Sequence, residues 1–185
     1  MTCIVGLVQD GKVYIGVDSQ GTDGRWNATQ RKDPKVFTRD GIIFGFTSSY
    51  RMGQLLRYKL EIPRRFQDES IEEFMHTRFI EEVRTTFTEG GFGKTDSGEQ
   101  SGGSFLVGVE GRLFHIESDF QVGESELPFD ACGCGDAFAL GALTVLDRLL
   151  GETAEHRVTE AIKVAALHSA GVGGAVTVLS AEAST

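Results

Sequence analysis

The chain has 185 residues, of which 40% are hydrophobic, and this is enough to bury the core of one globular domain spanning 1–185. Its formal net charge of −9 argues against binding to a phosphate backbone, so we expect no nucleic-acid partner. The sequence has no apolar run of the ~20 residues that a membrane helix needs, and no basic segment followed by an apolar one at its start. We therefore expect a cytoplasmic protein that does not bind membranes.

Short β-hairpins are predicted at three points along the chain. At each point a dipeptide of an acidic residue and glycine separates two runs that are rich in Val, Ile, Leu or Phe. Such dipeptides supply the positive φ angles of a two-residue hairpin turn. The three dipeptides are Asp10-Gly11, Asp40-Gly41 and Glu110-Gly111, and a last strand is expected over 175–180.

Helical periodicity occurs in two pairs of segments. The apolar residues of 52–60 fall on one helical face, and Ser70 begins a capping box that predicts a second helix over 70–90. The segments 135–150 and 153–169 predict another helix pair. Because the helices come in pairs rather than between successive parallel strands, the order favours a layered α+β domain over a doubly wound one.

The stretch GGFGKTDSGEQSGG, residues 90–103, contains Gly93-Lys94-Thr95, which could suggest a phosphate-binding loop. A Walker loop needs a glycine five residues before its final Gly-Lys, and residue 88 is Thr. A helix is also predicted before this stretch, where a strand is required. We therefore expect a flexible surface connection here.

The start of the chain could carry a nucleophile. If Met1 is removed, the hydroxyl of Thr2 lies beside a free α-amino group, and methionine aminopeptidase accepts Thr at this position. An α-amino group titrates at about 7.7–8.0, so a useful fraction is neutral near pH 7 and can take the proton from Thr Oγ, directly or through a water. The alternative is an ordinary start followed by a β-branched strand residue.

Five segments resemble, in this order, the proteasome β-subunit and HslV branch of the N-terminal nucleophile (Ntn) hydrolases: TCIVGL, GVDSQGT, RKDPKVF, GIIFGFTSSY and CGCGDAFALGAL. The resemblance covers essentially the whole chain and implies a four-layer αββα sandwich. It also implies that Thr2, Asp18 and Lys35 converge in an active site. The Lys35 ammonium would favour the ionised hydroxyl and keep the terminal amine neutral, while Asp18 would orient Lys35.

The same resemblance assigns three further roles. The backbone N–H of Ser48, in the turn after the fourth strand, would be the oxyanion donor, although the family usually has glycine there. The side chains expected to line the substrate pocket are Phe37, Phe46 and Tyr50. Cys134 stands where the family has a serine that forms a hydrogen bond near the nucleophile's amine, and a thiol is a weaker donor.

The activity implied is that of a threonine peptidase, which cleaves peptides or unfolded proteins through an acyl-enzyme. The resemblance further implies a homo-oligomeric ring that encloses the sites and, in many members, an ATP-dependent unfoldase as partner. It implies no cofactor for the chemistry. His168 lies near the loop where family members bind a cation through backbone carbonyls, which leaves a structural cation open.

Two other functions fit the same residues. The chain could be a non-catalytic ring or shell subunit, which Cys134 and the serine-rich turn at 47–49 favour. It could also be an amidase that acts on a small molecule with the same chemistry. A free N-terminal Thr2 with Lys35 directed at it would distinguish an enzyme from the structural subunit.

Overall fold

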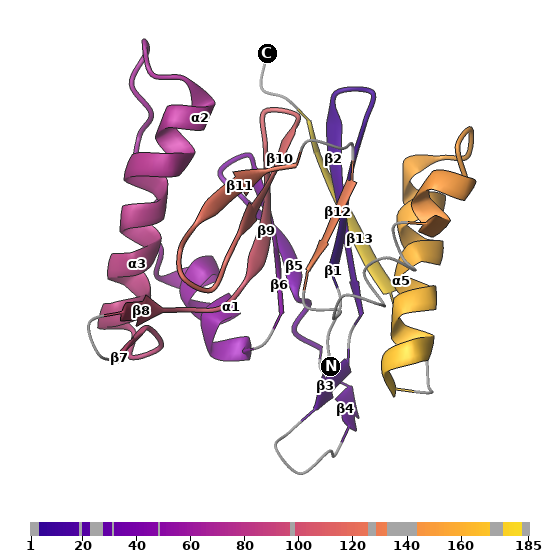
Figure 1. The fold of residues 1–185 in the computed structure, drawn as a ribbon, viewed down its shortest axis with the longest axis horizontal. Coiled ribbons are helices and arrows are strands. Elements are labelled where there is room, and N and C mark those ends of the chain that lie inside the picture. The colour runs from indigo at the N-terminus through magenta and orange to yellow at the C-terminus, as the bar shows by residue number, and fades with distance from the viewer. Residues whose placement is uncertain are drawn as a thin grey trace.

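The computed structural model describes residues 4–18, 20–22, 28–30, 32–47, 49–96, 99–125, 129–132, 144–170 and 176–182. Two antiparallel sheets lie at its centre (Figure 1). The first has the order β12-β1-β2-β13, with bounds Phe129–Cys132, Ile4–Gln9, Lys12–Asp18 and Val176–Glu182. The second has the order β11-β10-β9-β6-β5, with bounds Val122–Glu124, Arg112–Ile116, Phe105–Val109, Ile42–Phe46 and Val36–Arg39.

The three predicted hairpins are confirmed, and their turns have the expected backbone angles. The φ values of Asp10 and Gly11 are 54° and 71°, those of Asp40 and Gly41 are 50° and 78°, and those of Glu110 and Gly111 are 50° and 74°. Two successive residues with positive φ form a type I′ turn, whose twist matches that of paired strands. The turns thus fix the register of β1 with β2, β5 with β6 and β9 with β10.

The helices also lie close to their predicted positions. Ser70 caps its helix as expected, since its Oγ accepts a hydrogen bond of 3.0 Å from the backbone N–H of Glu73. Of the predicted helix over 135–150, the structure describes 144–150, which is helical over 144–148. The other helices are α1 (Tyr50–Tyr58), α2 (Ile71–Phe74), the π-helix η1 (Met75–Phe79), α3 (Ile80–Glu89) and α5 (Ala154–Ala170).

The glycine-rich stretch over 90–103 differs from the predicted flexible connection. It contains an antiparallel hairpin of β7 (Lys94–Asp96) and β8 (Glu99–Ser101). A similar short pair joins β3 (Gln20–Thr22) to β4 (Ala28–Gln30). These strands are polar and three residues long, so they lack the apolar alternation by which a strand is predicted.

Three apolar clusters explain how the layers pack. An aromatic-rich cluster joins the second sheet to α1, α2, η1 and α3, and a smaller cluster joins the first sheet to α5, as Figure 1 shows. A third cluster contains side chains of both sheets. The sheets are close at Gly108, where a Cβ would lie 2.5 Å from side-chain atoms of both Ile43 and Val13.

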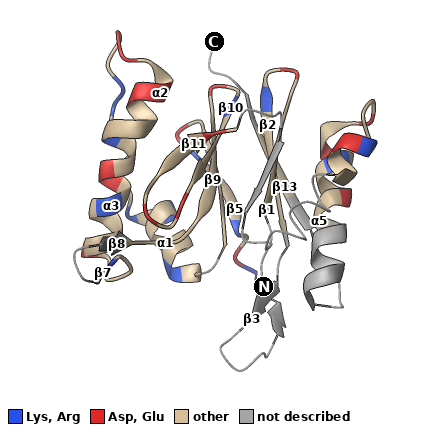
Figure 2. Cartoon of the chain, viewed as in Figure 1, with Lys and Arg blue, Asp and Glu red and all other residues tan. Residues whose placement is uncertain are grey.

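Most of the charged residues that the structure describes lie outside this core, whereas Lys35 and Arg157 are buried. Figure 2 shows Lys, Arg, Asp and Glu mainly on the helices and hairpin turns, whereas the described parts of the central strands are largely uncharged. Among the helices that the structure describes, none has the length and apolar character that a membrane span requires.

The π-helix carries a cluster that regular periodicity did not predict. From this segment Arg78 donates a hydrogen bond of 3.1 Å from Nε to Glu69 Oε1 and forms an ion pair with the same carboxylate through Nη2. Its Nη1 also donates to the carbonyl of Arg64, and its guanidinium carbon lies 3.8 Å from the centre of the Phe66 ring. Arg78 therefore holds the loop that precedes α2.

Substituting Glu69→Gln tests this cluster. The hydrogen bond from Arg78 lowers the pKa of Glu69, so the folded state favours the ionised carboxylate. Its stabilising effect is then fully present above the ordinary glutamate pKa of about 4.3 and is lost as the pH falls through the folded-state value. We expect the variant to unfold at a lower Tm than wild type at pH 7, with the difference shrinking at acidic pH. Thermal unfolding followed by circular dichroism at several pH values measures this.

Glu89→Gln is the control, because Glu89 pairs with Lys59 in an exposed ion pair. Such pairs contribute little stability, so its Tm should stay near that of wild type. A Tm loss in Glu69→Gln that is the same at pH 3 and pH 7 would contradict the electrostatic explanation.

Candidate active site

The five predicted catalytic residues are described to different extents. Lys35 directly precedes β5, and its side chain is buried, with 3% of the residue exposed. Asp18 is the last residue of β2, as the sequence predicts, and only its backbone is described. Thr2, Ser48 and Cys134 lie outside the described residues.

The structure brings together chain segments that adjoin three of these residues. Ile4, two residues after the predicted nucleophile, pairs with Val17, which directly precedes the predicted acid. Both belong to the buried cluster shared by the two sheets, and so does Val36, which directly follows the predicted lysine. The start of β1, the end of β2 and the start of β5 therefore meet at one place.

Lys35 is fixed at its backbone and faces an aromatic ring. Its carbonyl oxygen accepts a hydrogen bond of 3.0 Å from the backbone N–H of Phe46 in β6. Its Nζ lies 5.9 Å from the centre of the Tyr50 ring, within the range of a cation–π contact. The backbone of Lys35 is thus fixed to β6, and its ammonium lies over the ring of the first residue of α1.

The turn that joins β6 to α1 is anchored on both sides of Ser48. The Thr47 hydroxyl donates a hydrogen bond of 3.2 Å to the carbonyl of Ser104, and the Ser49 backbone N–H donates one of 2.6 Å to the Thr47 carbonyl. Ser49 also caps α1, since its Oγ accepts from the backbone N–H of Arg51 at 3.1 Å. The residues next to the predicted oxyanion donor are therefore held in place.

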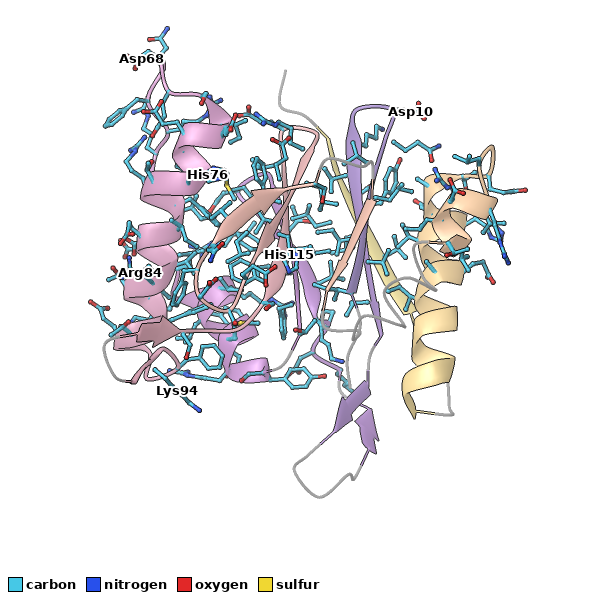
Figure 3. The ribbon with its side chains drawn as sticks, viewed as in Figure 1. Asp10, Asp68, His76, Arg84, Lys94 and His115 are labelled. Atoms are coloured by element: carbon cyan, nitrogen blue, oxygen red, sulfur yellow. The ribbon has the colours of Figure 1, made fainter. Side chains whose placement is uncertain are left out.

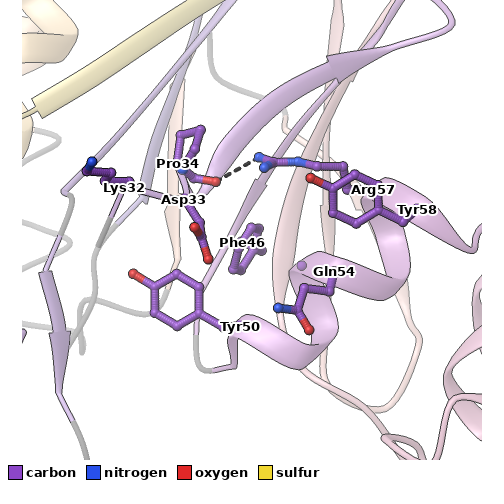
Figure 4. A pocket seen from close by; sticks show the side chains of 9 residues that line it. Lys32, Asp33, Pro34, Phe46, Tyr50, Gln54, Arg57 and Tyr58 are labelled. Atoms are coloured by element: carbon purple, nitrogen blue, oxygen red, sulfur yellow. Dashed lines mark hydrogen bonds between the residues drawn. The ribbon is translucent and has the colours of Figure 1, made fainter. Parts of the chain in front are cut away.

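A pocket of about 340 Å³ opens beside Lys35, between the segment that precedes this lysine and one face of α1. Figure 4 shows the Asp33 carboxyl group pointing toward the space between Tyr50 and Phe46. The pocket is lined by residues of the segment before β5, of β6 and of α1: Lys32, Asp33, Pro34, Phe46, Tyr50, Gly53, Gln54, Arg57 and Tyr58.

Two of the three side chains predicted to line a substrate pocket, Phe46 and Tyr50, do line this one. Phe37 lies instead in the aromatic core, where its ring stacks on Phe44 with 5.1 Å between the ring centres. Asp33 and Arg57 also line the pocket, although the sequence pattern did not predict either of them there. The helical spacing that begins at Tyr50 could have identified Arg57, two turns further along α1.

Gly53 allows the Phe46 ring, which lines the pocket, to pack against α1. A Cβ at this position would lie 2.0 Å from Cζ of Phe46, so the ring packs directly on the helix backbone. We expect Gly53→Ala to displace Phe46, to lower the free energy of unfolding by about 1–3 kcal/mol and to weaken ligand binding in the pocket. Urea unfolding measures the first effect, and the affinity of the pocket for small aromatic ligands measures the second.

Gly123→Ala is the control for this substitution, because nothing lies within 4 Å of the added Cβ in β11. Alanine is the better helix former by about 1 kcal/mol, so propensity alone would make Gly53→Ala more stable than wild type. A stabilised Gly53→Ala protein with unchanged ligand affinity would therefore contradict this packing.

The described residues contain no group of three or more His, Cys, Asp or Glu side chains that could hold a metal ion. Figure 3 shows His76 on the outer helix and His115 on β10, well apart from each other. The structural cation near His168 stays a prediction.

Comparison with known proteins gives matches at the level of structure. No family model and no curated protein matches the chain. BPH of Thiobacillus denitrificans, solved in complex with epoxomicin, matches with a TM-score of 0.79 and 19% identity over 100% of both chains. HslV from Trypanosoma brucei matches with a TM-score of 0.68 and 21% identity over 98% of this chain and 99% of its own. The chain has an HslV-like fold.

A further structural match is Anbu, an ancestral beta-subunit, from Yersinia bercovieri. Its TM-score is 0.63 and its identity 16%, over 97% of this chain and 82% of its own. The HslV-like fold agrees with the order of hairpins and helices predicted from the sequence.

Proposed function

We propose that the chain is an N-terminal threonine peptidase with the four-layer αββα arrangement of the Ntn hydrolases, in a single domain over 1–185. The observation that carries the proposal is the buried Lys35, which lies between residues that line the pocket and the cluster shared by the two sheets. Pro34 on one side of it lines the pocket, and Val36 on the other side belongs to the buried cluster that contains the start of β1 and the end of β2. The HslV-like fold supports it.

In the proposed reaction, the neutral α-amine of Thr2 takes the proton from Thr2 Oγ as the oxygen attacks a peptide carbonyl. The backbone N–H of Ser48 donates to the oxyanion of the tetrahedral intermediate. Collapse of this intermediate breaks the C–N bond, and the departing amine receives the proton from the α-ammonium. Water then hydrolyses the resulting ester and frees Thr2.

The remaining predicted residues support this step. The positive charge of Lys35 favours the ionised hydroxyl and disfavours a second positive charge on the amine. In this mechanism Asp18 would orient Lys35, and the Cys134 thiol would take the role of the family's serine as a weaker hydrogen-bond donor near the amine. The pocket that Phe46 and Tyr50 line receives a substrate side chain, and Phe37 supports it from the core.

The proposed substrates are peptides or unfolded proteins, cleaved in the cytoplasm inside a homo-oligomeric ring with an ATP-dependent unfoldase as partner. The alternative is a non-catalytic structural subunit of the same fold. The cysteine at position 134, in place of the family's serine, favours this alternative.

The test is the intact mass of the protein, expressed without an N-terminal tag and then incubated with epoxomicin, a peptide epoxyketone. The neighbouring BPH was solved in complex with this compound, which supports its use as the probe. We expect the loss of one methionine and one covalent adduct that maps to Thr2. Retained methionine, or a free Thr2 that does not react, would favour the structural subunit.

A further inference from the structure

Arg57 of α1 contacts the backbone on both sides of Lys35. Its Nη2 donates a hydrogen bond of 2.7 Å to the carbonyl of Pro34, drawn in Figure 4, and another of 3.5 Å to the carbonyl of Val36. The carbonyl of Lys35 itself accepts from the backbone N–H of Phe46. Three consecutive carbonyls are therefore held, the middle one by β6 and the outer two by one guanidinium.

The guanidinium is itself held in place by the core. Its carbon lies 4.5 Å from the centre of the Phe37 ring, and that ring stacks on Phe44. The carbonyls of Leu56 and Arg57 accept hydrogen bonds of 3.4 and 3.3 Å from Arg39, which joins this end of α1 to β5. The Arg57 side chain is thus held in one position by its contacts.

Within the described residues, Arg57 forms no ion pair with a carboxylate, and its hydrogen bonds go to backbone carbonyls. Hydrogen bonds from a charged donor are stronger than neutral ones. The planar guanidinium can also stack on Phe37 while it donates, which a lysine ammonium cannot do in the same way. The arrangement therefore depends on the shape of arginine as well as on its charge.

We infer that Arg57 is a positioning residue for Lys35, and that it couples the filling of the pocket to the placement of this lysine. Arg57 lines the pocket and also holds the carbonyls of Pro34 and Val36. A substrate side chain in the pocket therefore contacts the same group that fixes the lysine segment. The inference rests on the proposed function, in which Lys35 activates Thr2.

The chain offers a matched control in Arg51, which lies on the same helix. Its Nε and Nη2 also donate to a backbone carbonyl, that of Gly90, at 3.3 and 3.0 Å. Arg51 is exposed and does not line the pocket. Arg51→Met therefore removes an arginine and its carbonyl contacts from α1 without touching the segment that carries Lys35.

The experiment compares Arg57→Met, Arg57→Lys and Arg51→Met in three measurements. These are kcat and KM for a peptide substrate, the pH dependence of epoxomicin labelling, and hydrogen exchange of the backbone amides over 42–47. We expect Arg57→Met to lower kcat by about 10- to 100-fold, to shift the pH profile and to speed exchange at the Phe46 amide. Arg57→Lys should keep KM near that of wild type while kcat falls, because charge remains but the geometry is lost. Arg51→Met should match wild type in all three.

The outcomes separate this inference from the proposed function. If wild-type protein neither cleaves peptides nor binds epoxomicin, the proposed function fails, and exchange at Phe46 still decides whether Arg57 holds the lysine segment. If the Arg57 variants match Arg51→Met in exchange and in pH profile, the inference is wrong. Should Arg57→Met fail to fold, Arg57→Lys gives the same comparison in a folded protein.

Discussion

Replacing Thr2 with alanine is expected to reduce peptide hydrolysis on the order of 10⁴-fold or more, which leaves only the residual rate that the oxyanion donor and substrate binding supply. The variant lacks the Thr2 hydroxyl, which is the proposed nucleophile beside the free α-amine, so no acyl-enzyme can form there. Alanine at position 2 still permits removal of Met1, so processing is unchanged. Turnover of a fluorogenic peptide and the mass of the epoxomicin-treated protein measure the loss.

Two further variants separate the hydroxyl from the amine. Thr2→Ser keeps both groups and should retain measurable turnover. A glutamate inserted between Met1 and Thr2 prevents methionine removal, so it keeps the hydroxyl but takes away the free α-amine beside it. That protein should be inactive. Unchanged turnover in Thr2→Ala would contradict the threonine mechanism, and full activity in the insertion variant would contradict the amine as general base.

Local sequence patterns predicted much of the fold, because the features concerned depend on residues close together in the chain. The turn at Asp10-Gly11 needs two residues that accept positive φ, and the cap at Ser70 needs one side-chain oxygen three residues before a free N–H. The π-helix over Met75–Phe79 was not predicted. Its Arg78 binds residues nine and fourteen positions earlier in the chain. Helical periodicity concerns residues three or four positions apart, so it does not predict these contacts.

The pocket shows why the candidate site was harder to predict than the fold. Val36 and Phe37 are neighbours on β5 and both are buried, since one faces the other sheet and the other faces the helices. A strand that is covered on both faces shows no alternation of apolar and polar residues, so its sequence does not indicate which side chain reaches a pocket. Arg57 joins the site through carbonyls more than twenty residues away. Only tertiary packing defines such a contact.

Replacing Lys35 with methionine should lower kcat/KM by about 10²- to 10⁴-fold, comparable to the loss of a group that controls proton transfer. Methionine has a similar length and keeps the packing, but it removes the charge that favours the ionised hydroxyl of Thr2. The rate of epoxomicin labelling at Thr2 should fall with it. Lys59→Met is the control, because Lys59 is exposed and lies outside the pocket, and it should leave both rates unchanged.

Stability gives this last prediction a second readout. The Lys35 ammonium is buried, and its loss would leave the proposed partner Asp18 as an unpaired carboxylate, which is strongly destabilising where the pair is buried. Lys35→Met should therefore lower the Tm together with the activity, whereas Lys35→Met combined with Asp18→Asn should recover the Tm but not the activity. A double variant that recovers neither would instead indicate that Lys35 serves the packing between β5 and α1, and that result would favour the non-catalytic subunit.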